Sequence, residues 1–458
     1  MPRKGGKAIA SGSYGCVFRP ALKCRGNTDD ERHNGVSKLM YQNDANEEMD
    51  EMEPILKTVR ELPNSEKFFA VNDIDMCEPG HLNDADKESF NNKCSSFISD
   101  GINSSNVNKQ LSELSIINMP DLGKDMHDYI RDQEPFSVKS FEKFNKMMIN
   151  LLINGVVPMN QSNVLHHDLK DTNIMVDSNG NTIIIDWGFA GVSSTNSPVP
   201  INVIGRPIQY NTPFSSMLIN KKFVSEYKNV CSKLKKQPLT NKQNKSFLKQ
   251  YFDYHVKRNP GHESYLKQTI AAIFPGENMS NLFLNYNSEV LDQFTSGCNF
   301  DMVRFFKEVY IFNVDVWGAC TTFIQFLKAP EMMDKLPPDM KTRALAIYKE
   351  ILLDICFKHG SKIIDINKIV LLLSKIAGSN SLPAVATSRH TDVVEKTVFP
   401  FPDIPTTSPR GEDSVRSKKH SPTRRRKKRC PNGYRRHPKT KRCTIMSGPN
   451  KGNVINTP

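Results

Sequence analysis

The sequence lacks any long apolar run. Stretches such as Val370–Leu373 are far shorter than the roughly 18 apolar residues that a membrane-spanning helix needs, so no span is predicted. The opening segment Met1–Gly6 has no apolar core of the kind that a secretory signal carries. These two absences make a cytosolic site of action the expectation. With 38% hydrophobic and 24% charged residues, the composition suits a soluble globular protein with some disordered polar sequence.

The chain also lacks the cysteine density of a protein built on disulfides. Ten cysteines are scattered over 458 residues, so we expect most of them to be reduced and packed. Cys77 and Cys94 have no second pair at the spacing of zinc ligands, which argues against a structural zinc site.

Positive charge is concentrated near the C-terminus. Residues 410–442 contain 15 lysines and arginines against two acids, and their local net charge of +13 equals the formal charge of the whole chain. The rest of the sequence is therefore close to neutral. Such a run would serve nuclear import, nucleic acid, an anionic membrane or an acidic partner, and simple solvation is the alternative. No aromatic residues interleave with Arg424–Arg429, so base stacking is not expected.

The most informative polar side chains lie in Val164–Gly188, which reads VLHHDLKDTNIMVDSNGNTIIIDWG. A loop with Asp168 and Asn173 is followed by a turn, an isoleucine-rich strand and Asp186. Two carboxylates and an amide on adjacent loops can orient an attacking hydroxyl and hold Mg2+ against nucleotide phosphates. Asp, Asn and Gly also simply form turns, but the spacing of the whole group favours phosphoryl transfer.

The same residues resemble the signatures of protein kinases. HHDLKDTN is similar to the H-R-D-L-K-x-x-N catalytic loop of that family, and DWG is similar to its D-F-G motif. The resemblance implies that Asp168 orients the attacking hydroxyl and that Lys170 steadies the transferring phosphoryl group. It implies Asn173 and Asp186 as ligands of Mg2+, with ATP as the phosphoryl donor. His166 is expected to pack the loop.

A glycine-rich segment near the N-terminus resembles the kinase loop G-x-G-x-x-G-x-V, with Ala10 in place of the first glycine. Glycines let backbone N–H groups approach phosphates without a Cβ in the way. A glycine-rich turn alone is weak evidence for nucleotide binding, and its position upstream of the kinase-like catalytic loop makes that evidence stronger. The nucleotide-binding residues implied here are Ile9, Gly12, Ser13, Tyr14, Gly15 and Val17.

The segment VSKLM resembles the strand whose lysine contacts the nucleotide phosphates, which implies Lys38 for that catalytic and nucleotide-binding role. A surface lysine on an edge strand is the alternative. An apolar stripe predicts a helix over Asp44–Leu62, and kinases place a glutamate on this helix to pair with the lysine. Glu48 fits best, and Glu47 and Glu51 stay open.

Strands separated by a polar insertion are predicted over Pro63–Ser115. The following LSIINMPDLGKDM resembles the strand and hinge of the kinase small lobe. This implies Asn118 as the gatekeeper and Met119–Leu122 as the backbone partners of adenine, with Met119 assigned to nucleotide binding. Pro120 has no N–H, so hinge donors come from its neighbours.

Later motifs extend the resemblance through a large lobe. IFNVDVWGA resembles the D-x-W-S-x-G helix start, where Asp315 holds the backbone of the catalytic loop. That helix, with Leu-Lys after the base, separates the chain from small-molecule kinases of the aminoglycoside and choline type. A long insertion at about 215–300 is predicted as an elaboration of the lobe, with a docking surface as the alternative. Helices are also predicted over Ser140–Gly155, Ala344–Phe357 and Ile363–Ile376.

Besides Ala10, three positions depart from the family's pattern. His167 stands where many kinases carry the arginine that pairs with an activation-segment phosphate. A histidine is charged only near its ordinary pKa of about 6.5, so we expect that activation-loop phosphorylation is not the main switch. Phe214 replaces the glutamate that anchors the segment, so the anchor must differ. Trp187 replaces phenylalanine and keeps a large apolar side chain.

From residue 377 onward Ser, Thr, Pro and charge dominate, which predicts a disordered basic linker over 377–429. Residues 430–445 form a short basic module in which Cys430 and Cys443 could close one disulfide. It resembles C-P-N-G-x-R-R modules in proteins of nucleocytoplasmic large DNA viruses. This resemblance implies a viral protein of the host cytoplasm or the virion, with nuclear import through the basic run left open.

The sequence therefore predicts an α+β, bilobal protein-kinase-like fold. It has a small β-rich lobe at 1–118, a large helical lobe at 119–376 and a disordered basic C-terminal tail. The predicted function is a protein serine/threonine kinase that uses Mg-ATP, and Ser/Thr over Tyr rests on Lys170. The alternatives are a pseudokinase or nucleotide-binding scaffold, and a virion protein that binds nucleic acid through its tail. Nothing in the sequence indicates the physiological substrate, the regulator or the oligomeric state.

Overall fold

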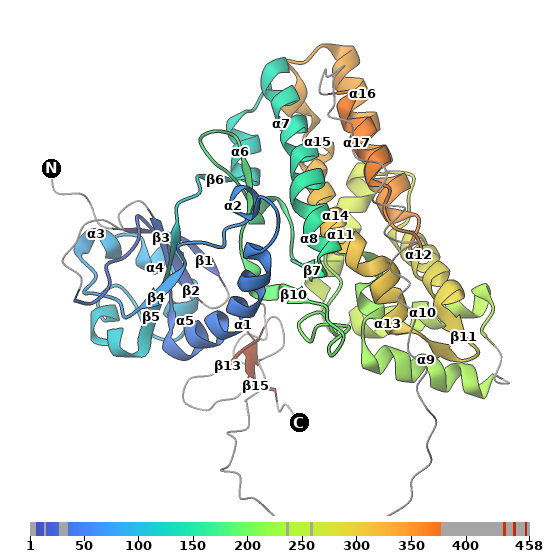
Figure 1. The fold of residues 1–458 in the computed structure, drawn as a ribbon, viewed down its shortest axis with the longest axis horizontal. Coiled ribbons are helices and arrows are strands. Elements are labelled where there is room, and N and C mark those ends of the chain that lie inside the picture. The colour runs from blue at the N-terminus through green and yellow to red at the C-terminus, as the bar shows by residue number, and fades with distance from the viewer. Residues whose placement is uncertain are drawn as a thin grey trace, which may run out of the picture. The chain divides into compact units, whose positions relative to one another are not determined.

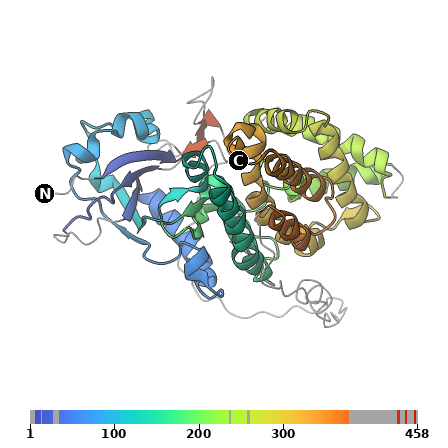
Figure 2. The same ribbon diagram turned by 90° about the horizontal axis from the view of Figure 1, so that it is seen from above.

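The computed structural model describes residues 6–12, 15–26, 35–234, 238–256 and 260–376, and three short strands beyond them. The chain divides into two compact units, Met1–Ser381 and Leu382–Pro458. The first unit contains a sheet-rich part, blue in Figure 1 and Figure 2, and a helical part coloured green to orange. Within the described ranges, no helix combines the length and the apolar character needed to cross a bilayer.

A five-stranded antiparallel sheet forms the N-terminal part, in the order β1-β2-β3-β5-β4. Side-chain alternation buries Cys16 and Phe18 of β2 on one face. β2 and β3 approach so closely that a Cβ at Gly15 would collide with the carbonyl oxygen of Leu39. The strands are Lys7–Gly12 (β1), Gly15–Arg19 (β2), Gly35–Tyr41 (β3), Asp75–Cys77 (β4) and Leu114–Pro120 (β5).

Helices cover both faces of this sheet. α1 (Gln42–Arg60) packs on the face that carries Met40 and Ile117. The opposite face packs against short helices in which Phe90 and Phe97 are fully buried. These helices are α3 (Asp84–Lys87), α4 (Phe90–Lys93) and α5 (Ser95–Ser99).

Over Pro63–Ser115 the predicted strands are present as β4 and the start of β5, and the insertion between them is helical. Apart from β4 and the start of β5, this segment contains α2 (Ser65–Phe68), helices α3 to α5 and the 3-10 turns Val107–Lys109 and Leu111–Glu113. Helices of four or five residues are too short to display a helical period, so their polar, Asn-rich sequence was interpreted as an insertion between strands.

Three disulfides also correct the expectation that most cysteines are reduced. Their partners lie 78, 53 and 67 residues apart, so no local spacing marks them. Cys320 and Cys356 are free and buried. The disulfides are Cys16–Cys94, Cys24–Cys77 and Cys231–Cys298.

The helical part is organised around α7 (Val138–Asn150) and α14 (Ile311–Cys320). The three predicted helices are present, but two of them pass into π-helical segments, Leu151–Val156 after α7 and Glu350–Phe357 after α16. A third π-helical segment, Phe306–Tyr310, leads into α14. The other elements are α6 (Met126–Asp132), α8 (Val157–Gln161), α15 (Ile324–Lys328), α16 (Pro338–Lys349), α17 (Ile366–Ser374) and the 3-10 turns Thr321–Phe323 and Pro330–Met333.

The predicted insertion at 215–300 is integrated into the helical part. Phe223, Tyr227 and Phe300 are buried together in it, and the disulfide Cys231–Cys298 cross-links two of its segments. This burial fits an elaborated lobe, while a docking role stays a prediction. Its elements are the 3-10 turn Phe214–Leu218 and α9 (Lys221–Lys233), α10 (Asn241–Val256), α11 (Pro260–Ile273), α12 (Met279–Phe294), β11 (Thr295–Ser296) and β12 (Asn299–Phe300), after which α13 (Met302–Phe305) follows.

Short strand pairs position the loops that carry the predicted catalytic residues. β7 (Val164–Leu165) pairs with β10 (Gly191–Val192). β8 (Ile174–Val176) pairs with β9 (Thr182–Ile184) and β6 (Lys124–Asp125). The loop after β7 contains the 3-10 turn Asp171–Asn173, and the loop after β9 contains the 3-10 turn Trp187–Phe189.

The second unit contains three short antiparallel strands, β13 (Tyr434–Arg436), β14 (Cys443–Ile445) and β15 (Val454–Ile455). Arg436 pairs with Cys443, so the predicted basic module contains a hairpin. Cys430 and the linker 377–429 lie outside the described residues. The disulfide suggested for the module and the disorder suggested for the linker therefore stay predictions.

Candidate active site

Helix α14 holds the loop that follows β7. Asp315 is fully buried, and its Oδ2 and Oδ1 accept the backbone N–H groups of His166 and His167 at 2.9 and 2.8 Å. Burial raises the pKa of the Asp315 carboxyl, against the opposing effect of these donors. One turn later, a Cβ at Gly318 would collide with the carbonyl oxygen of Leu169. The role predicted for Asp315, holding the loop backbone, is confirmed.

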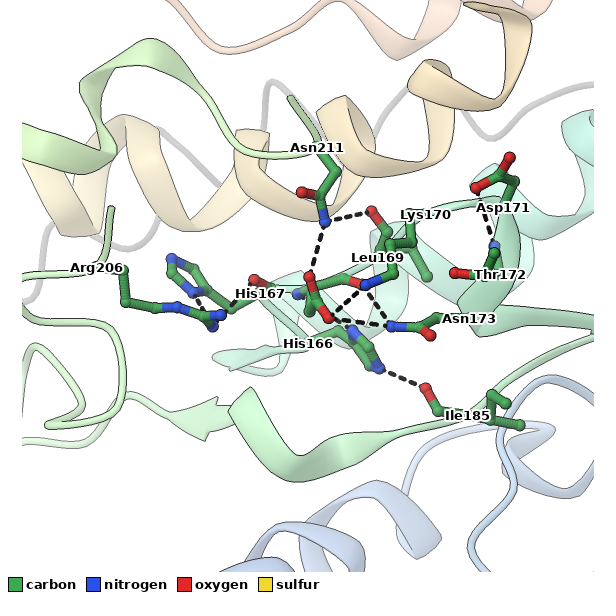
Figure 3. A network of polar contacts seen from close by, with 11 residues as sticks. His166, His167, Leu169, Lys170, Asp171, Thr172, Asn173, Ile185, Arg206 and Asn211 are labelled. Atoms are coloured by element: carbon green, nitrogen blue, oxygen red, sulfur yellow. Dashed lines mark hydrogen bonds and ion pairs between the residues drawn. The ribbon is translucent and has the colours of Figure 1, made fainter. Parts of the chain in front are cut away.

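The carboxylate of Asp168 is buried among hydrogen-bond donors. Lys170 Nζ donates to its Oδ2 at 2.9 Å, and Asn173 Nδ2 donates to the same oxygen at 3.2 Å. Asn211 Nδ2 donates to Oδ1 at 2.9 Å and to the carbonyl of Leu169 at 3.2 Å. Figure 3 shows these side chains converging on the loop, with Asn211 reaching it from another segment. Among the described residues, three side-chain nitrogen atoms therefore donate to this carboxylate.

His166 links this loop to the segment before Asp186. Its Nδ1 accepts from the backbone N–H of Asp168 at 3.3 Å, so its Nε2 carries the proton and donates to the carbonyl of Ile185 at 2.8 Å. The ring lies edge-on to Trp187, with centroids 5.1 Å apart. His166 thus packs and orients both loops.

His167 belongs to a buried chain of hydrogen bonds with a fixed direction. A guanidinium can only donate, so Arg206 Nη1 donates to His167 Nδ1 at 2.9 Å. His167 Nε2 then carries the proton and donates to Tyr310 Oη at 2.7 Å. Tyr310 Oη lies 2.9 Å from Ser216 Oγ, which donates to the carbonyl of Pro213 at 2.7 Å. The chain joins the catalytic loop, the segment after Gly191 and the last residue before α14.

This environment keeps His167 neutral. Burial, and then the positive charge of Arg206, lower the pKa of His167 well below 6.5. The Arg206 guanidinium stacks 3.7 Å from the centroid of the Phe189 ring. Burial lowers the pKa of Arg206 as well, but an arginine stays protonated at neutral pH. The positive charge therefore resides on Arg206.

The position where kinases carry an anchoring glutamate is filled by the buried Phe214. Its ring contacts Trp317, Phe357 and Tyr286 at centroid distances of 5.0, 5.4 and 5.5 Å. An aromatic cluster thus anchors the segment in place of an ion pair.

Lys38 and Glu48 form a partly buried ion pair, with Nζ at 2.6 and 2.8 Å from the two carboxylate oxygens. The pairing expected of Glu48 is therefore present. Val17 lies directly beside Lys38 in the β2–β3 register.

The gatekeeper prediction for Asn118 was wrong, because its side chain lies on the face of β5 away from Lys38. Ile117 and Met119, opposite Lys38 and Val36 in the β3–β5 register, lie on the face that Lys38 shares. Asn118 pairs with Ser37 on the other face and accepts from its hydroxyl at 2.6 Å. Its amide also lies 3.5 Å from the sulfur atoms of Cys24 and Cys77. A shift of one residue along a strand reverses the face, and the apolar run around Asn118 does not specify the phase.

Of the predicted phosphate-binding loop, Gly12 and Gly15 face each other across the β1–β2 turn, and Ser13 and Tyr14 lie outside the described residues. Ile9 lies at the irregularity between Ala8 and Ala10 and is 37% exposed. Met119 lies near the end of β5, opposite Val36.

The two predicted metal ligands present suitable oxygen atoms. The amide nitrogen of Asn173 donates to the Asp168 loop, which leaves its carbonyl oxygen free for a cation. Asp186 is exposed, and its carboxylate receives no hydrogen bond from the part of the chain that the structure describes. A carboxylate and an amide oxygen form a hard donor set that suits Mg2+, which takes few protein ligands and keeps waters. The residues present fit the ion.

Sequence reasoning missed Arg206 and Asn211, and also the contacts of Asp171. Asp171 accepts from Gln325 Nε2 at 2.7 Å and lies 3.2 Å from His127 Nδ1, which ties the loop to α15 and α6. Arg206 and Asn211 lie in the segment GRPIQYNTPF, which ends at Phe214. Their place shortly before Phe214 was the only indication in the sequence, because no neighbouring residue shows that they contact His167 and Asp168.

A family model described as "Protein kinase domain" matches residues 102–213. The match covers β5, the catalytic loop and Asp186, and it ends at Pro213. It does not reach Lys38, Glu48 or α14. Together with the helices and antiparallel sheets, the match fits an α+β protein-kinase-like fold and supports a relation to the protein kinase superfamily. It supports, in general terms, kinase activity with ATP, a divalent metal and protein substrates.

Proposed function

We propose that the chain is a protein serine/threonine kinase that transfers the γ-phosphate of Mg-ATP to serine and threonine hydroxyls. The observation that carries the proposal is the ion pair of Asp168 with Lys170, in which Nζ lies 2.9 Å from Oδ2, on a loop adjoining Asn173. Serine/threonine specificity rests on Lys170, two positions after Asp168.

Each residue has a distinct task in this mechanism. Asp168 accepts a hydrogen bond from the acceptor hydroxyl and orients its oxygen for in-line attack. Lys170 neutralises charge on the transferring phosphoryl group, and Lys38, positioned by Glu48, binds the other phosphates. Asn173 and Asp186 would hold Mg2+, which would supply positive charge to offset the charge that develops on the phosphate oxygens.

The test is phosphoryl transfer from radiolabelled ATP to a generic basic protein. We expect label on phosphoserine and phosphothreonine after acid hydrolysis, and a loss of at least about 10³-fold in the Asp168→Asn variant. The matched control is Asp177→Asn, which changes a half-buried carboxylate in the β8–β9 turn, away from the Asp168 loop. Equal labelling by wild type and Asp168→Asn would refute the catalytic assignment, and label on tyrosine would refute the specificity.

Activation without phosphorylation of the activation segment is part of the proposal. The hydrogen-bond chain from Arg206 through His167 and Tyr310 to Ser216 supports it. The charged member of this chain is Arg206, which belongs to the activation segment, so the segment is held to the catalytic loop without a phosphate. Replacing Ser193, Ser194, Thr195 and Ser197 by alanine should leave kcat within about threefold, whereas Arg206→Met should lower it by more than about 10-fold. A severe loss in the alanine variant would contradict this mode of activation.

A pseudokinase is the less favoured alternative. The departures that motivate it are Ala10, His167 and Phe214, and the last two have their own buried partners in the fold. A viral source, with action in the host cytoplasm or the virion, belongs to the same proposal and rests on the resemblance of the C-terminal module. Detection of the chain by mass spectrometry in purified virus particles would test the virion site.

A further inference from the structure

Asn211 is a buried side chain that touches the proposed base but belongs to no signature of the catalytic loop. It is 2% exposed, and Asp168 beside it is 5% exposed. Its Nδ2 is shared between Asp168 Oδ1 at 2.9 Å and the Leu169 carbonyl at 3.2 Å. Among the described residues, Asn211 supplies the donor to Oδ1, whereas Lys170 and Asn173 both donate to Oδ2.

The backbone that carries Asn211 is held from two sides. Trp317 Nε1 donates to the carbonyl of Tyr210 at 3.0 Å, directly before Asn211. The ring of Tyr210 lies edge-on to Tyr265 of α11, with centroids 5.4 Å apart. The amide therefore approaches Asp168 from a rigid support, and the inserted helix α11 is connected to the carboxylate through two residues.

A single donor on Oδ1 has a geometric consequence. A carboxylate with donors on one oxygen can rotate about its Cβ–Cγ bond, and a donor on the other oxygen stops this rotation. The acceptor hydroxyl must meet an oxygen of Asp168 within hydrogen-bond distance, and small misplacements of such groups are costly.

We propose that Asn211 is a positioning residue, which orients the Asp168 carboxylate toward the acceptor hydroxyl and couples it to the segment that carries Tyr210. The inference rests on the proposed kinase function for its catalytic consequence. Its geometric content, an amide donor on a buried carboxylate, does not depend on that function.

Replacing Asn211 by aspartate tests the proposal with almost no change of shape. The introduced carboxyl can donate to Asp168 only while it is protonated, and two carboxylates at this distance repel. The ratio of kcat in Asn211→Asp to kcat in wild type should therefore fall by about 10²-fold as pH rises from about 5 to about 8. KM for ATP should change less than about threefold. The charged groups recorded near this pair are Lys170 and Arg206, which interact with Asp168, and Asp171, which acts on the neighbouring Tyr210.

Asn220→Asp is the matched control. Asn220 caps α9 by accepting from the N–H of Lys222 at 2.8 Å, and aspartate caps a helix equally well. The same chemical change in the same part of the chain should therefore leave the pH profile of kcat parallel to wild type. A lower but parallel profile in Asn211→Asp would mean that Asn211 acts through packing alone, and it would overturn the proposal.

A second measurement does not need activity. The difference in Tm between wild type and Asn211→Asp should grow by about 3 °C or more from pH 5 to pH 8, because the repulsion develops as the introduced carboxyl ionises beside Asp168. A pH-independent difference would refute the contact with Asp168. If wild type transfers no phosphate but the Tm difference grows, the proposed function fails and the orienting contact stands. If wild type is active, and neither kcat nor Tm of Asn211→Asp changes with pH relative to wild type, the kinase function stands and the positioning role of Asn211 is refuted.

Discussion

Two residues of the site have backbone conformations that residues with a side chain rarely adopt. His167 has φ 62° and Asp186 has φ 66°. Such conformations cost on the order of 1–3 kcal/mol and persist where neighbours impose them. Here the backbone of His167 is fixed by Asp315, and that of Ile185, next to Asp186, by Asn173 at 3.1 Å. The strain lies beside the proposed base and the proposed metal ligand, where orientation matters most.

Phe214 should contribute to stability as a core residue. Phe214→Ala removes a fully buried ring from the aromatic cluster, and the free energy of unfolding should fall by about 3–5 kcal/mol. Chemical denaturation monitored by fluorescence and circular dichroism measures the change. Ile201→Ala is the control, because Ile201 is 75% exposed and its truncation should stay within about 0.5 kcal/mol. Equal effects of the two substitutions would contradict the aromatic anchor.

His167 should make stability depend on pH. Its folded pKa lies well below 6.5, so between the two values the unfolded chain binds a proton that the folded chain does not. The free energy of unfolding should be insensitive to His167 above about pH 7 and fall as pH drops below 6.5, by up to about 1.4 kcal/mol per unit. His167→Asn tolerates the positive φ and lacks this titration. Parallel stability curves of wild type and variant between pH 5 and 7 would contradict the assignment.

At the scale of single residues, the sequence predicts contacts between side chains that lie close together along the chain. Asp168, Lys170 and Asn173 lie on one loop, so their spacing alone indicates their meeting. Arg206 and Asn211 meet the loop across 39 and 43 residues, and only the folded segment brings them there.

At the scale of elements, long amphipathic helices were predictable and short ones were not. The apolar patterns of α1, α7 and α17 each repeat over several turns. Helices α3 to α5 are stabilised by packing against the sheet through Phe90 and Phe97, which propensity and period do not reveal.

The disulfide Cys16–Cys94 should stabilise the packing of helices α4 and α5 against β2. Replacing both cysteines by serine should lower the free energy of unfolding by about 2–4 kcal/mol under non-reducing conditions. ATP affinity should fall with it, because β2 begins at Gly15 of the proposed phosphate-binding loop. Non-reducing peptide mapping of wild type should recover the linked pair. An unchanged denaturation midpoint and no linked peptide would contradict the cross-link.

At the scale of the whole molecule, catalysis and the basic tail should be separable. The first unit contains all the proposed catalytic residues, whereas the concentrated positive charge lies at 410–442. A fragment of residues 1–376 should retain phosphoryl transfer and lose salt-dependent binding to heparin. A full chain with Arg424–Arg429 changed to glutamine should behave like the fragment in the heparin assay, which separates charge from length. Loss of phosphoryl transfer in the fragment would favour the tail as the main function.

The disulfides also bear on how the chain is made. Each joins cysteines 53 to 78 positions apart, so during synthesis the second cysteine of each pair leaves the ribosome well after the first. The early cysteines must stay unpaired until their partners have folded into reach. A glutathione-buffered cytosol reduces such cross-links, so their formation calls for an oxidising compartment or a dedicated thiol oxidant. Routine addition of a strong reductant during purification would accordingly yield a less cross-linked protein than the cell makes.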